Sequence, residues 1–372
     1  MKIAFIVPGG VDRSGRFKVI PHYLWLFEEF SRVHDVHVIS LYQYPAPCKY
    51  KLLGANIYDL GNIAEEWGND NEPAFALRNT YAKALEILQT NGPWDVIHGF
   101  RGTQPGWLAA AIGRYLHTPS VVSFLGQELN SGSSDHCRRL VTQSSSHSSC
   151  LTVASGFMAE IAKSQGFNTR LIPFGVHDSC FQANKTQDQP PWQLLSVADI
   201  NHVKDHFTML HALKRVVERI SQVHLDIIGV DTLDGMILRL IEELRLTKHV
   251  TVHGSLPNDL VRPFFQRAHL YLVTSRHEGG PISMLEAAAC CVPTVGTKVG
   301  YVADWSNERS SAAEIGDADA LAAGILKLLD NSALRMELGK TALKWARKYD
   351  IKWTTGALLN LYGSLLGRDR MD

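Results

Sequence analysis

Short apolar segments alternate with longer amphipathic segments along most of the chain. Apolar runs rich in β-branched residues are typical of strands buried in a parallel sheet. They predict strands at Lys2–Val7, Val36–Ser40, Trp94–Gly99, Ser120–Phe124, Ser148–Ala154, Gln193–Val197, Val223–Gly229, Val250–Gly254, Leu270–Thr274 and Val292–Val295. The spacing between them predicts helices that include His22–Val33, Ala74–Thr90, Gly156–Gln165, Met236–Leu244, Ile282–Cys291 and Ile351–Leu366. This alternation predicts an α/β protein whose two halves are each doubly wound, mainly parallel sheets.

The length of the chain, 372 residues, favours two domains. The segment Gln182–Trp192 is polar and contains two adjacent prolines, which is typical of an interdomain linker. We therefore expect a first domain over residues 1–182 and a second over residues 183–350.

The composition excludes several classes of protein. The 37 acidic and 37 basic residues balance, so nothing indicates a nucleic-acid partner. The six cysteines have neither metal-ligand spacing nor a disulfide pattern, which favours a reducing cytoplasm. The apolar start, Met1–Val7, has only the length of a strand and lacks the features of a signal peptide. No apolar run is long enough to span a bilayer, although contact with the inner face of a membrane stays open.

One stretch, Ser275–Gly300, carries the most specific chemistry: SRHEGGPISMLEAAACCVPTVGTKVG. A predicted strand leads into a glycine-bearing loop, and Pro281 is expected at the first helical position, where its missing N–H has no cost. The helix start therefore lies at the carboxyl end of a strand, where open α/β sheets bind ligands. Its free N–H groups suit phosphate, and we expect them on Gly280, Ile282 and Ser283.

Two carboxylates flank this helix start. Glu278 precedes the helix and Glu286 lies within it, so the two can reach hydroxyl groups on opposite sides of a bound diphosphate. A carboxylate accepts two hydrogen bonds well from a vicinal diol. A sugar, a diphosphate and a ribose in a row would fit this arrangement.

The stretch resembles the signature of retaining nucleotide-sugar glycosyltransferases of family 4, the glycosyl transferases group 1. That signature has a Glu, a Gly/Pro turn, a second Glu, a helix of small residues and a Pro-Val strand. The resemblance implies the GT-B fold, with two Rossmann-like domains facing a cleft and a final helix, residues 351–372, that crosses back to the first domain. It also implies that the loop bearing Gly279, Gly280 and Pro281 binds the donor.

The resemblance extends to other parts of the second half. The segment ADINHVKDHFTMLHAL, which begins at Ala198, is similar to a family segment whose lysine binds the donor diphosphate, and Lys204 matches that lysine. The arginine that the family pairs with it is replaced by Asp199. The nucleotide base packs in the family near the loop that begins here at Ser255.

Three residues of the first half are candidates through the same resemblance. Gly10 lies in the glycine turn after the first strand, where family members approach the donor phosphate or the acceptor. His98 ends a predicted strand, and Glu128 supplies the acid of the segment LGQEL, so both are expected on the acceptor side. Leu125 stands where the family usually has a histidine and can neither donate nor accept a proton.

The resemblance implies retaining transfer of a glycosyl group, with Glu278 and Lys204 as the catalytic residues. The donor would be a nucleotide sugar, UDP favoured over GDP, and the acceptor a glycan, lipid-linked or small molecule of cell-surface polysaccharide or glycoconjugate synthesis. No cofactor or metal is expected, because Asp317 and Asp319 suit the start of a helix. Two alternatives stay open: a nucleotide-sugar epimerase of the same fold, and a non-catalytic subunit that binds sugar nucleotides or glycans.

Overall fold

The computed structural model describes residues 1–61, 73–129, 134–182 and 188–367. The chain forms two compact units: unit 1 is Met1–Phe174 with Ile351–Asp372, and unit 2 is Gly175–Asp350. The final helix thus belongs to unit 1. The linker expected at 182–192 contains residues 183–187, which lie outside the described residues. The prediction of an α/β protein with two doubly wound, parallel-sheet halves is confirmed.

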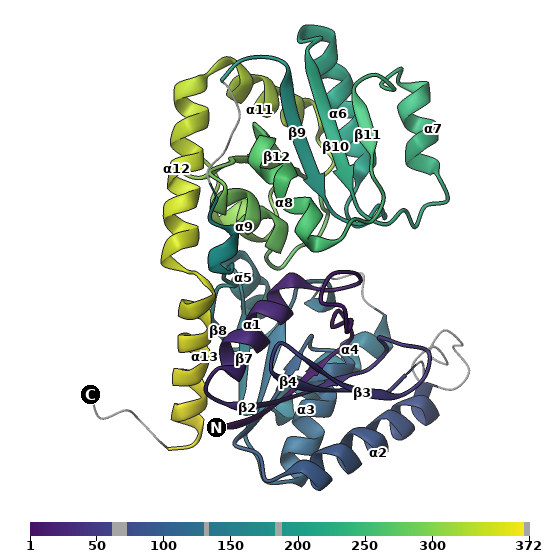
Figure 1. The fold of residues 1–372 in the computed structure, drawn as a ribbon, viewed down its shortest axis with the longest axis vertical. Coiled ribbons are helices and arrows are strands. Elements are labelled where there is room, and N and C mark those ends of the chain that lie inside the picture. The colour runs from purple at the N-terminus through teal and green to yellow at the C-terminus, as the bar shows by residue number, and fades with distance from the viewer. Residues whose placement is uncertain (62–72, 130–133, 183–187, 368–372) are drawn as a thin grey trace. The chain divides into compact units, whose positions relative to one another are not determined.

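Unit 1 is built on an eight-stranded sheet with the strand order β3-β4-β2-β1-β5-β6-β7-β8 (Figure 1). Neighbouring strands are parallel except for the antiparallel pair β3 and β4. The strands are β1 Lys2–Val7, β2 Asp35–Ser40, β3 Cys48–Leu52, β4 Ala55–Asp59, β5 Val96–Phe100, β6 Ser120–Phe124, β7 Cys150–Val153 and β8 Thr169–Leu171.

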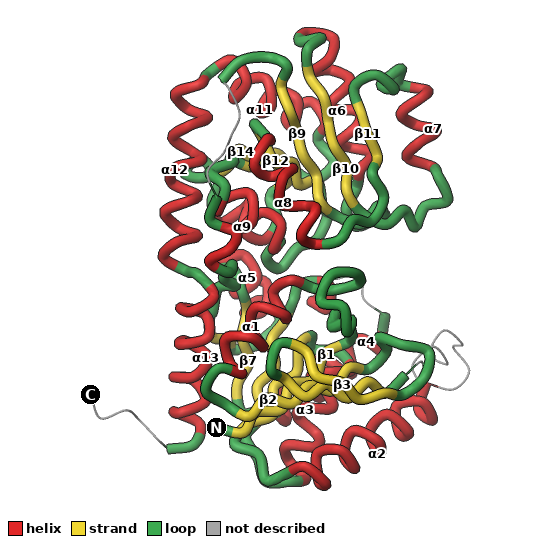
Figure 2. The backbone as a smooth tube through the Cα atoms, viewed as in Figure 1, coloured by secondary structure: helices red, strands yellow, loops and turns green. Residues whose placement is uncertain are grey.

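Helices cover both faces of this sheet (Figure 2). They are α1 Pro21–Ser31, α2 Pro73–Asn91, α3 Gln104–Tyr115, α4 Asp135–His147, α5 Gly156–Ser164 and α13 Ile351–Leu365. The alternation of side chains along β1 shows why both faces need cover. Ala4 and Ile6 pack in one cluster with Leu108 of α3, whereas Phe5 contacts the ring of Phe27 in α1. A strand that is buried on both faces reads as a continuous apolar run, which is how β1 appears in the sequence.

Unit 2 contains a six-stranded parallel sheet with the order β11-β10-β9-β12-β13-β14. The strands are β9 Trp192–Val197, β10 Val223–Ile228, β11 Val250–Val252, β12 Leu270–Val273, β13 Thr294–Thr297 and β14 Ser310–Ala313. The helices are α6 His206–Arg219, α7 Met236–Glu243, α8 Asn258–Arg267, α9 Ile282–Ala289, α10 Gly300–Asp304, α11 Ala318–Asp330 and α12 Ser332–Lys348. Leu194, Leu225 and Leu272 of the sheet pack with Leu213 of α6 and Ile325 of α11.

Each sheet has one point at which the strand order reverses. In unit 1, β2 lies on one side of β1 and β5 on the other, so the reversal falls between β1 and β5. In unit 2 it falls between β9 and β12. The loops leaving such a pair of strands diverge to opposite faces of the sheet and open a crevice at its carboxyl edge. Each unit therefore has one preferred place for a ligand.

Several element boundaries differ from the sequence prediction. The helix expected at 282–291 ends at Ala289, and Pro281 is its N-cap residue rather than its first helical residue. The side chain of Asn258 suggests an N-cap residue. In the structure Pro257 is the N-cap of α8, and Asn258 is the first helical residue. Helix ends depend on local turn geometry, which the hydrophobic periodicity of the sequence does not show.

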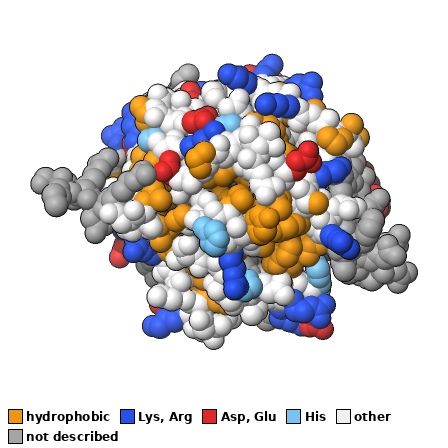
Figure 3. Space-filling view, turned by 90° about the horizontal axis from the view of Figure 1, so that it is seen from below, with side chains coloured by type: hydrophobic (Ala, Val, Ile, Leu, Met, Phe, Trp, Pro, Cys, Tyr) orange, Lys and Arg blue, Asp and Glu red, His pale blue; other side chains and the backbone are white. Residues whose placement is uncertain are grey.

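Figure 3 shows hydrophobic side chains gathered on the face seen from below, with Lys and Arg side chains around them. Within the described ranges, no helix is long and apolar enough to cross a membrane.

Candidate active site in the second unit

The loops that leave β9 and β12 meet at the reversal point of unit 2. Arg276 N–H donates to the carbonyl of Val203 at 2.7 Å. The hydroxyl of Thr274, directly after β12, donates to the carbonyl of Lys204 at 2.8 Å. These two bonds hold the segment before α6 against the segment before α9. As a result, the two sequence stretches that carry the candidate chemistry lie side by side.

Hydrogen bonds fix the backbone at Lys204. The amide oxygen of Asn201 accepts the N–H groups of Val203 and Lys204, both at 3.0 Å, which forms a tight turn. Asp205 follows in the left-handed region, with a φ of 48°, and its carboxylate caps α6 at Thr208. The turn thereby directs the Lys204 side chain out of the sheet edge toward the loop after β12.

The Lys204 ammonium group forms an ion pair with Glu278. The same Glu278 oxygen, Oε1, accepts a hydrogen bond from the hydroxyl of Ser275 at 2.7 Å. The two side chains remain 25% and 13% exposed. An ammonium group has three donors, so Lys204 can hold Glu278 and still bind oxygen atoms of a ligand. The pair therefore places one positive charge and one carboxylate at the mouth of the crevice.

The start of α9 supplies the second positive feature. Neither a capping side chain nor an acidic residue in the first turn satisfies this end. The first N–H groups of a helix have no intrahelical acceptors, and the helix dipole adds partial positive charge there. Ile282 and Ser283 occupy these positions, as the sequence predicts. An anion would be bound here by backbone donors.

Side-chain contacts fix this helix start to the sheet. The hydroxyls of Tyr271 and Ser283 lie 2.6 Å apart, and the Tyr271 hydroxyl is also 3.2 Å from the carbonyl of Val197. The loop at Gly279 passes very close to Gly300, where a Cβ atom would lie 3.1 Å from the Gly279 carbonyl oxygen. Gly300 has a φ of 48°, so both its conformation and the lack of space favour glycine.

Glu286 lies one helical turn further into α9 and is half-buried. Burial raises its pKa to about 7, and the charge of Arg262 on α8 opposes that rise. A carboxyl group with this pKa changes charge near neutral pH, so hydrogen-bond donors of a ligand would favour its ionised form. Its role toward a ribose stays a prediction.

Asp199 has a structural contact that the sequence does not indicate. Its Oδ1 accepts the backbone N–H of Val230 at 2.9 Å and so ties the loop after β9 to the loop after β10. Ser255 is exposed in the loop after β11. The preceding residues of that loop are fixed, because Gly229 N–H donates to the Gly254 carbonyl at 2.9 Å and His253 pairs with Asp226 at 2.6 Å.

The three candidates of unit 1 are engaged within that unit. We expected Gly10 to approach a donor phosphate or the acceptor. Its N–H instead donates to the amide oxygen of Gln43 at 2.7 Å. His98 is fully buried, since β5 continues to Phe100 and places the histidine inside the strand. Its Nδ1 lies 2.6 Å from the Tyr362 hydroxyl and its Nε2 2.8 Å from the Ser123 hydroxyl. Burial lowers the pKa of His98 to about 3, which keeps the ring neutral and does not support an acceptor-side role.

Glu128 is also turned inward. Its Oε1 accepts the N–H groups of Gly102 and Leu125, at 3.0 and 2.8 Å, and its Oε2 accepts that of Gly126 at 3.0 Å. The carboxylate thus holds together the loops after β5 and β6. Glu128 can therefore position these loops, but its carboxylate oxygens are engaged by backbone N–H groups rather than turned toward a ligand.

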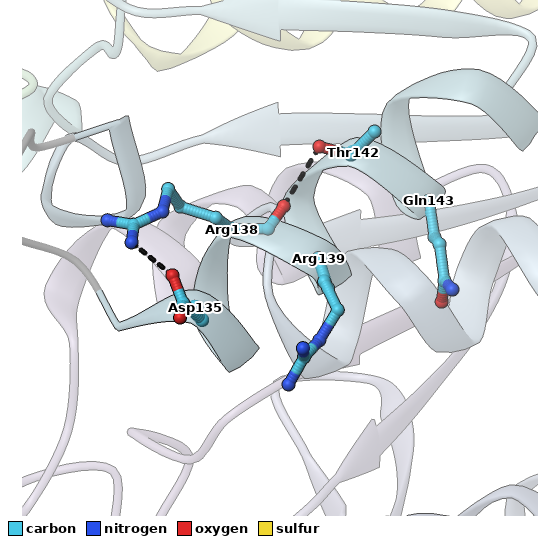
Figure 4. A pocket seen from close by; sticks show the side chains of 5 residues that line it. All are labelled: Asp135, Arg138, Arg139, Thr142 and Gln143. Carbon is cyan, nitrogen blue, oxygen red and sulfur yellow. Dashed lines mark hydrogen bonds and ion pairs between the residues drawn. The ribbon is translucent and has the colours of Figure 1, made fainter.

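A pocket of about 410 Å³ lies elsewhere in unit 1, along α4 (Figure 4). Arg138 is paired there with Asp135, and the hydroxyl of Thr142 donates to the Arg138 carbonyl at 2.9 Å. The pocket contains none of the candidate residues, so it does not bear on the site of unit 2.

No group of three or more His, Cys, Asp or Glu side chains is arranged to hold a metal ion within the described part of the chain. Asp317 caps α11 through a hydrogen bond from Ala320 N–H at 2.8 Å, which confirms its predicted structural role. Asp319 forms an ion pair with Arg215 of α6. Both carboxylates are therefore engaged by groups of unit 2.

Comparison with known proteins finds a match to the segment that contains these residues. Residues 181–345 match the family model described as Glycosyl transferases group 1. The matched residues lie within unit 2. TuaC of Bacillus subtilis, named as a teichuronic acid biosynthesis glycosyltransferase, is 27% identical over 224 residues, which cover 56% of this chain and 54% of TuaC. The chain thus spans about half the length of this curated relative.

Solved structures show the same fold over the whole chain. Sucrose-phosphate synthase from Thermosynechococcus elongatus has a TM-score of 0.79 and 17% identity, over 99% of this chain and 100% of that chain. Anabaena Alr3699/HepE, solved in complex with UDP and glucose, has a TM-score of 0.76 and 14% identity, over 98% and 100% of the two chains. At this identity the likeness shows the fold alone, two Rossmann-like domains of the GT-B type.

Proposed function

We propose that this chain transfers a glycosyl group from a nucleoside diphosphate sugar to an acceptor, with retention at the anomeric carbon. The observation that carries the proposal is the ion pair of Lys204 and Glu278 beside the uncapped start of α9, at the reversal point of unit 2. A cation, a carboxylate and a row of backbone donors at one edge match a sugar joined to a diphosphate. The Glycosyl transferases group 1 domain covers all three features.

The roles follow from the positions. Lys204 and the N–H groups of Ile282 and Ser283 would stabilise the negative charge that develops on the departing diphosphate. Glu278 would accept hydrogen bonds from sugar hydroxyls, and Glu286 from the ribose diol. The acceptor oxygen would attack from the face that the diphosphate leaves. The bond from the anomeric carbon to the phosphate oxygen breaks, the bond to the acceptor oxygen forms, and the acceptor proton passes to the leaving phosphate.

The proposal extends to the substrates and setting. A UDP sugar is the favoured donor, in line with the UDP complex of the HepE structure, and no metal is needed if Lys204 and α9 neutralise the diphosphate. The name of TuaC supports a polysaccharide or related glycoconjugate as the product. A cytoplasmic location with contact to the inner membrane face stays a prediction.

An assay with a panel of nucleotide sugars, with and without acceptors, tests the proposal. We expect released nucleotide and a new glycoside whose anomeric configuration equals that of the donor. An altered sugar nucleotide formed without any acceptor would instead indicate an epimerase. Binding without turnover across the panel would indicate a non-catalytic subunit.

A further inference from the structure

The reversal point of unit 1 carries the guanidinium group of Arg101, which has no hydrogen-bond or ion-pair partner among the described residues. Arg101 directly follows β5, where its N–H donates to the Ser123 carbonyl and its carbonyl accepts Gly106 N–H, both at 2.9 Å. A side chain on Gly106 would collide with that carbonyl, since a Cβ atom would lie 2.4 Å away. The backbone of Arg101 is thus fixed at the carboxyl edge of the sheet. Its half-buried guanidinium forms no hydrogen bond or ion pair with any side chain in residues 1–61, 73–129, 134–182 or 188–367.

The buried hydroxyl of Tyr23 lies near this edge of the sheet. Tyr23, near the start of α1, contacts the ring of Phe100 at the end of β5, with ring centroids 5.1 Å apart. Its side chain is 1% exposed, and its hydroxyl has no hydrogen-bond partner within the described residues. Burial raises the pKa of Tyr23, while the charge of Arg101 opposes that rise, so the guanidinium is within electrostatic reach of the hydroxyl. Leaving a buried hydroxyl unsatisfied is unfavourable, which suits a group that bonds to a ligand.

The surroundings of these two groups favour an anion. Helix α1 begins here with neither a capping side chain nor an acidic residue in its first turn, so its positive end is uncompensated. Tyr42, which is 40% exposed at the end of β2, is also within reach of the Arg101 charge. Glu128, the acid whose charge acts on Tyr23, already accepts three backbone N–H groups. Its charge is therefore balanced by donors other than Arg101.

We propose that the reversal point of unit 1 binds an anionic group of the acceptor, a phosphate or a carboxylate. Arg101 would supply the charge and a fork of donors, and the Tyr23 hydroxyl would donate one further hydrogen bond. The description of this ligand as an acceptor rests on the proposed function. The anion site itself rests only on the contacts of unit 1.

Calorimetric titration of the full chain with inorganic phosphate, and in parallel with malonate, tests this site. All proteins in the series carry Lys204→Ala, so that binding at the donor site of unit 2 is weakened. We expect Arg101→Gln to weaken binding of the preferred anion by about tenfold or more, because a charge-assisted pair is lost. Tyr23→Phe should weaken it by about fivefold while thermal unfolding stays the same or shifts upward, since the ring contact with Phe100 is kept.

Two exposed residues of α3 provide matched controls. Arg114→Gln and Tyr115→Phe make the same chemical changes away from the reversal point and should leave anion affinity unchanged. Equal anion affinity in Arg101→Gln and the parent protein, or no measurable binding of either anion to the parent, would overturn the proposal. Anion binding that depends on Arg101, together with no transferase activity in the wild-type protein, would leave the site standing and reject the proposed function instead. Transfer activity in the wild-type protein, together with anion binding that does not depend on Arg101, would support the proposed function and reject the anion site.

Discussion

The Lys204 ammonium and the Glu278 carboxylate form an ion pair that joins the loops leaving β9 and β12. The two residues are 74 positions apart in the sequence and meet because their strands are neighbours in the sheet. A ligand diphosphate would give Lys204 a stronger partner than a single carboxylate, and Glu278 would then be free to face the sugar. The pair therefore orients both side chains before the donor binds.

Replacement of Lys204 should affect turnover more than folding. It is the only side-chain cation that the proposed mechanism places at the diphosphate. A loss of about 3 kcal/mol in the transition state, the scale of one well-placed donor, corresponds to roughly a hundredfold in rate. We expect Lys204→Ala to lower kcat by at least about a hundredfold with an unchanged circular dichroism spectrum.

A second lysine offers the matched control for this substitution. Lys214 on α6 pairs with Glu218 at 3.4 Å and has no part in the proposed mechanism, so Lys214→Ala should leave kcat unchanged. Near-normal turnover in Lys204→Ala would mean that the diphosphate is stabilised by other groups.

Nucleotide binding should be linked to protonation of Glu286. Its pKa of about 7 means that roughly half of the protein carries the neutral form at neutral pH. A ribose diol donates hydrogen bonds to the ionised form, so binding of UDP should release protons. Affinity should then fall by roughly tenfold as the pH is lowered from about 8 to about 6.

Calorimetric titration in buffers of different ionisation enthalpy measures this link directly. We expect Glu286→Gln to bind UDP more weakly at pH 8 and to lose the pH dependence, and Glu286→Ala to bind more weakly still. A wild-type affinity that is flat across this pH range, or equal affinity in the variants, would remove Glu286 from the ribose site.

Asp199 should not be replaceable by the arginine that the family resemblance implies for this position. Its carboxylate holds the Val230 N–H, and an arginine cannot accept that bond. We expect Asp199→Arg to lower stability by about 1 kcal/mol and to weaken UDP binding, because the loop after β9 loses its attachment. Asp199→Asn keeps an acceptor oxygen and should behave nearly as wild type. Tighter UDP binding in Asp199→Arg would show that the site merely lacks positive charge.

Transfer activity should survive removal of divalent metal ions. Asp317 and Asp319 are occupied as a helix cap and as a partner of Arg215. We expect unchanged initial rates in excess chelator. Loss of activity that Mg²⁺ or Mn²⁺ restores would require a metal site at the diphosphate.

The fold was largely predictable because its signal is local. Buried parallel strands such as β1 and β12 read as short apolar runs, and the helices between them show helical spacing. The hairpin of β3 and β4 was not predicted, since β3 is an edge strand in which Leu52 is the one fully buried residue, so it shows no apolar run. The helix α4 was missed as well, because its sequence, DHCRRLVTQSSSH, is mostly polar.

The site was predictable only in part. Glu278, Ile282 and Ser283 follow from a strand, a glycine turn and a helix start in one stretch. Contacts between the loops after β9 and β12, such as the Thr274 hydroxyl with the Lys204 carbonyl or Lys204 with Glu278, depend on strand order, which periodicity does not give. Thr274 and Ser275 could have been found from the sequence, because they are polar residues directly after a buried strand.

His98 shows the cost of a small boundary error. The expected strand ended at Gly99, which put the histidine at the edge of the sheet, whereas β5 runs to Phe100. One further residue of strand moves His98 into the core, where it bonds to Tyr362 and Ser123. Arg101, two positions beyond the expected strand, has the place at the edge instead.

The central claim is that a nucleoside diphosphate binds at the reversal point of unit 2, on the start of α9. Backbone amide chemical shifts during a titration with UDP, followed by NMR on deuterated protein, test it most directly. We predict saturable shifts at the amides of Gly280, Ile282 and Ser283, together with Lys204, and their loss of amplitude in Lys204→Ala at the same UDP concentration. Saturable shifts confined to other residues, with these four amides unmoved, would contradict the account.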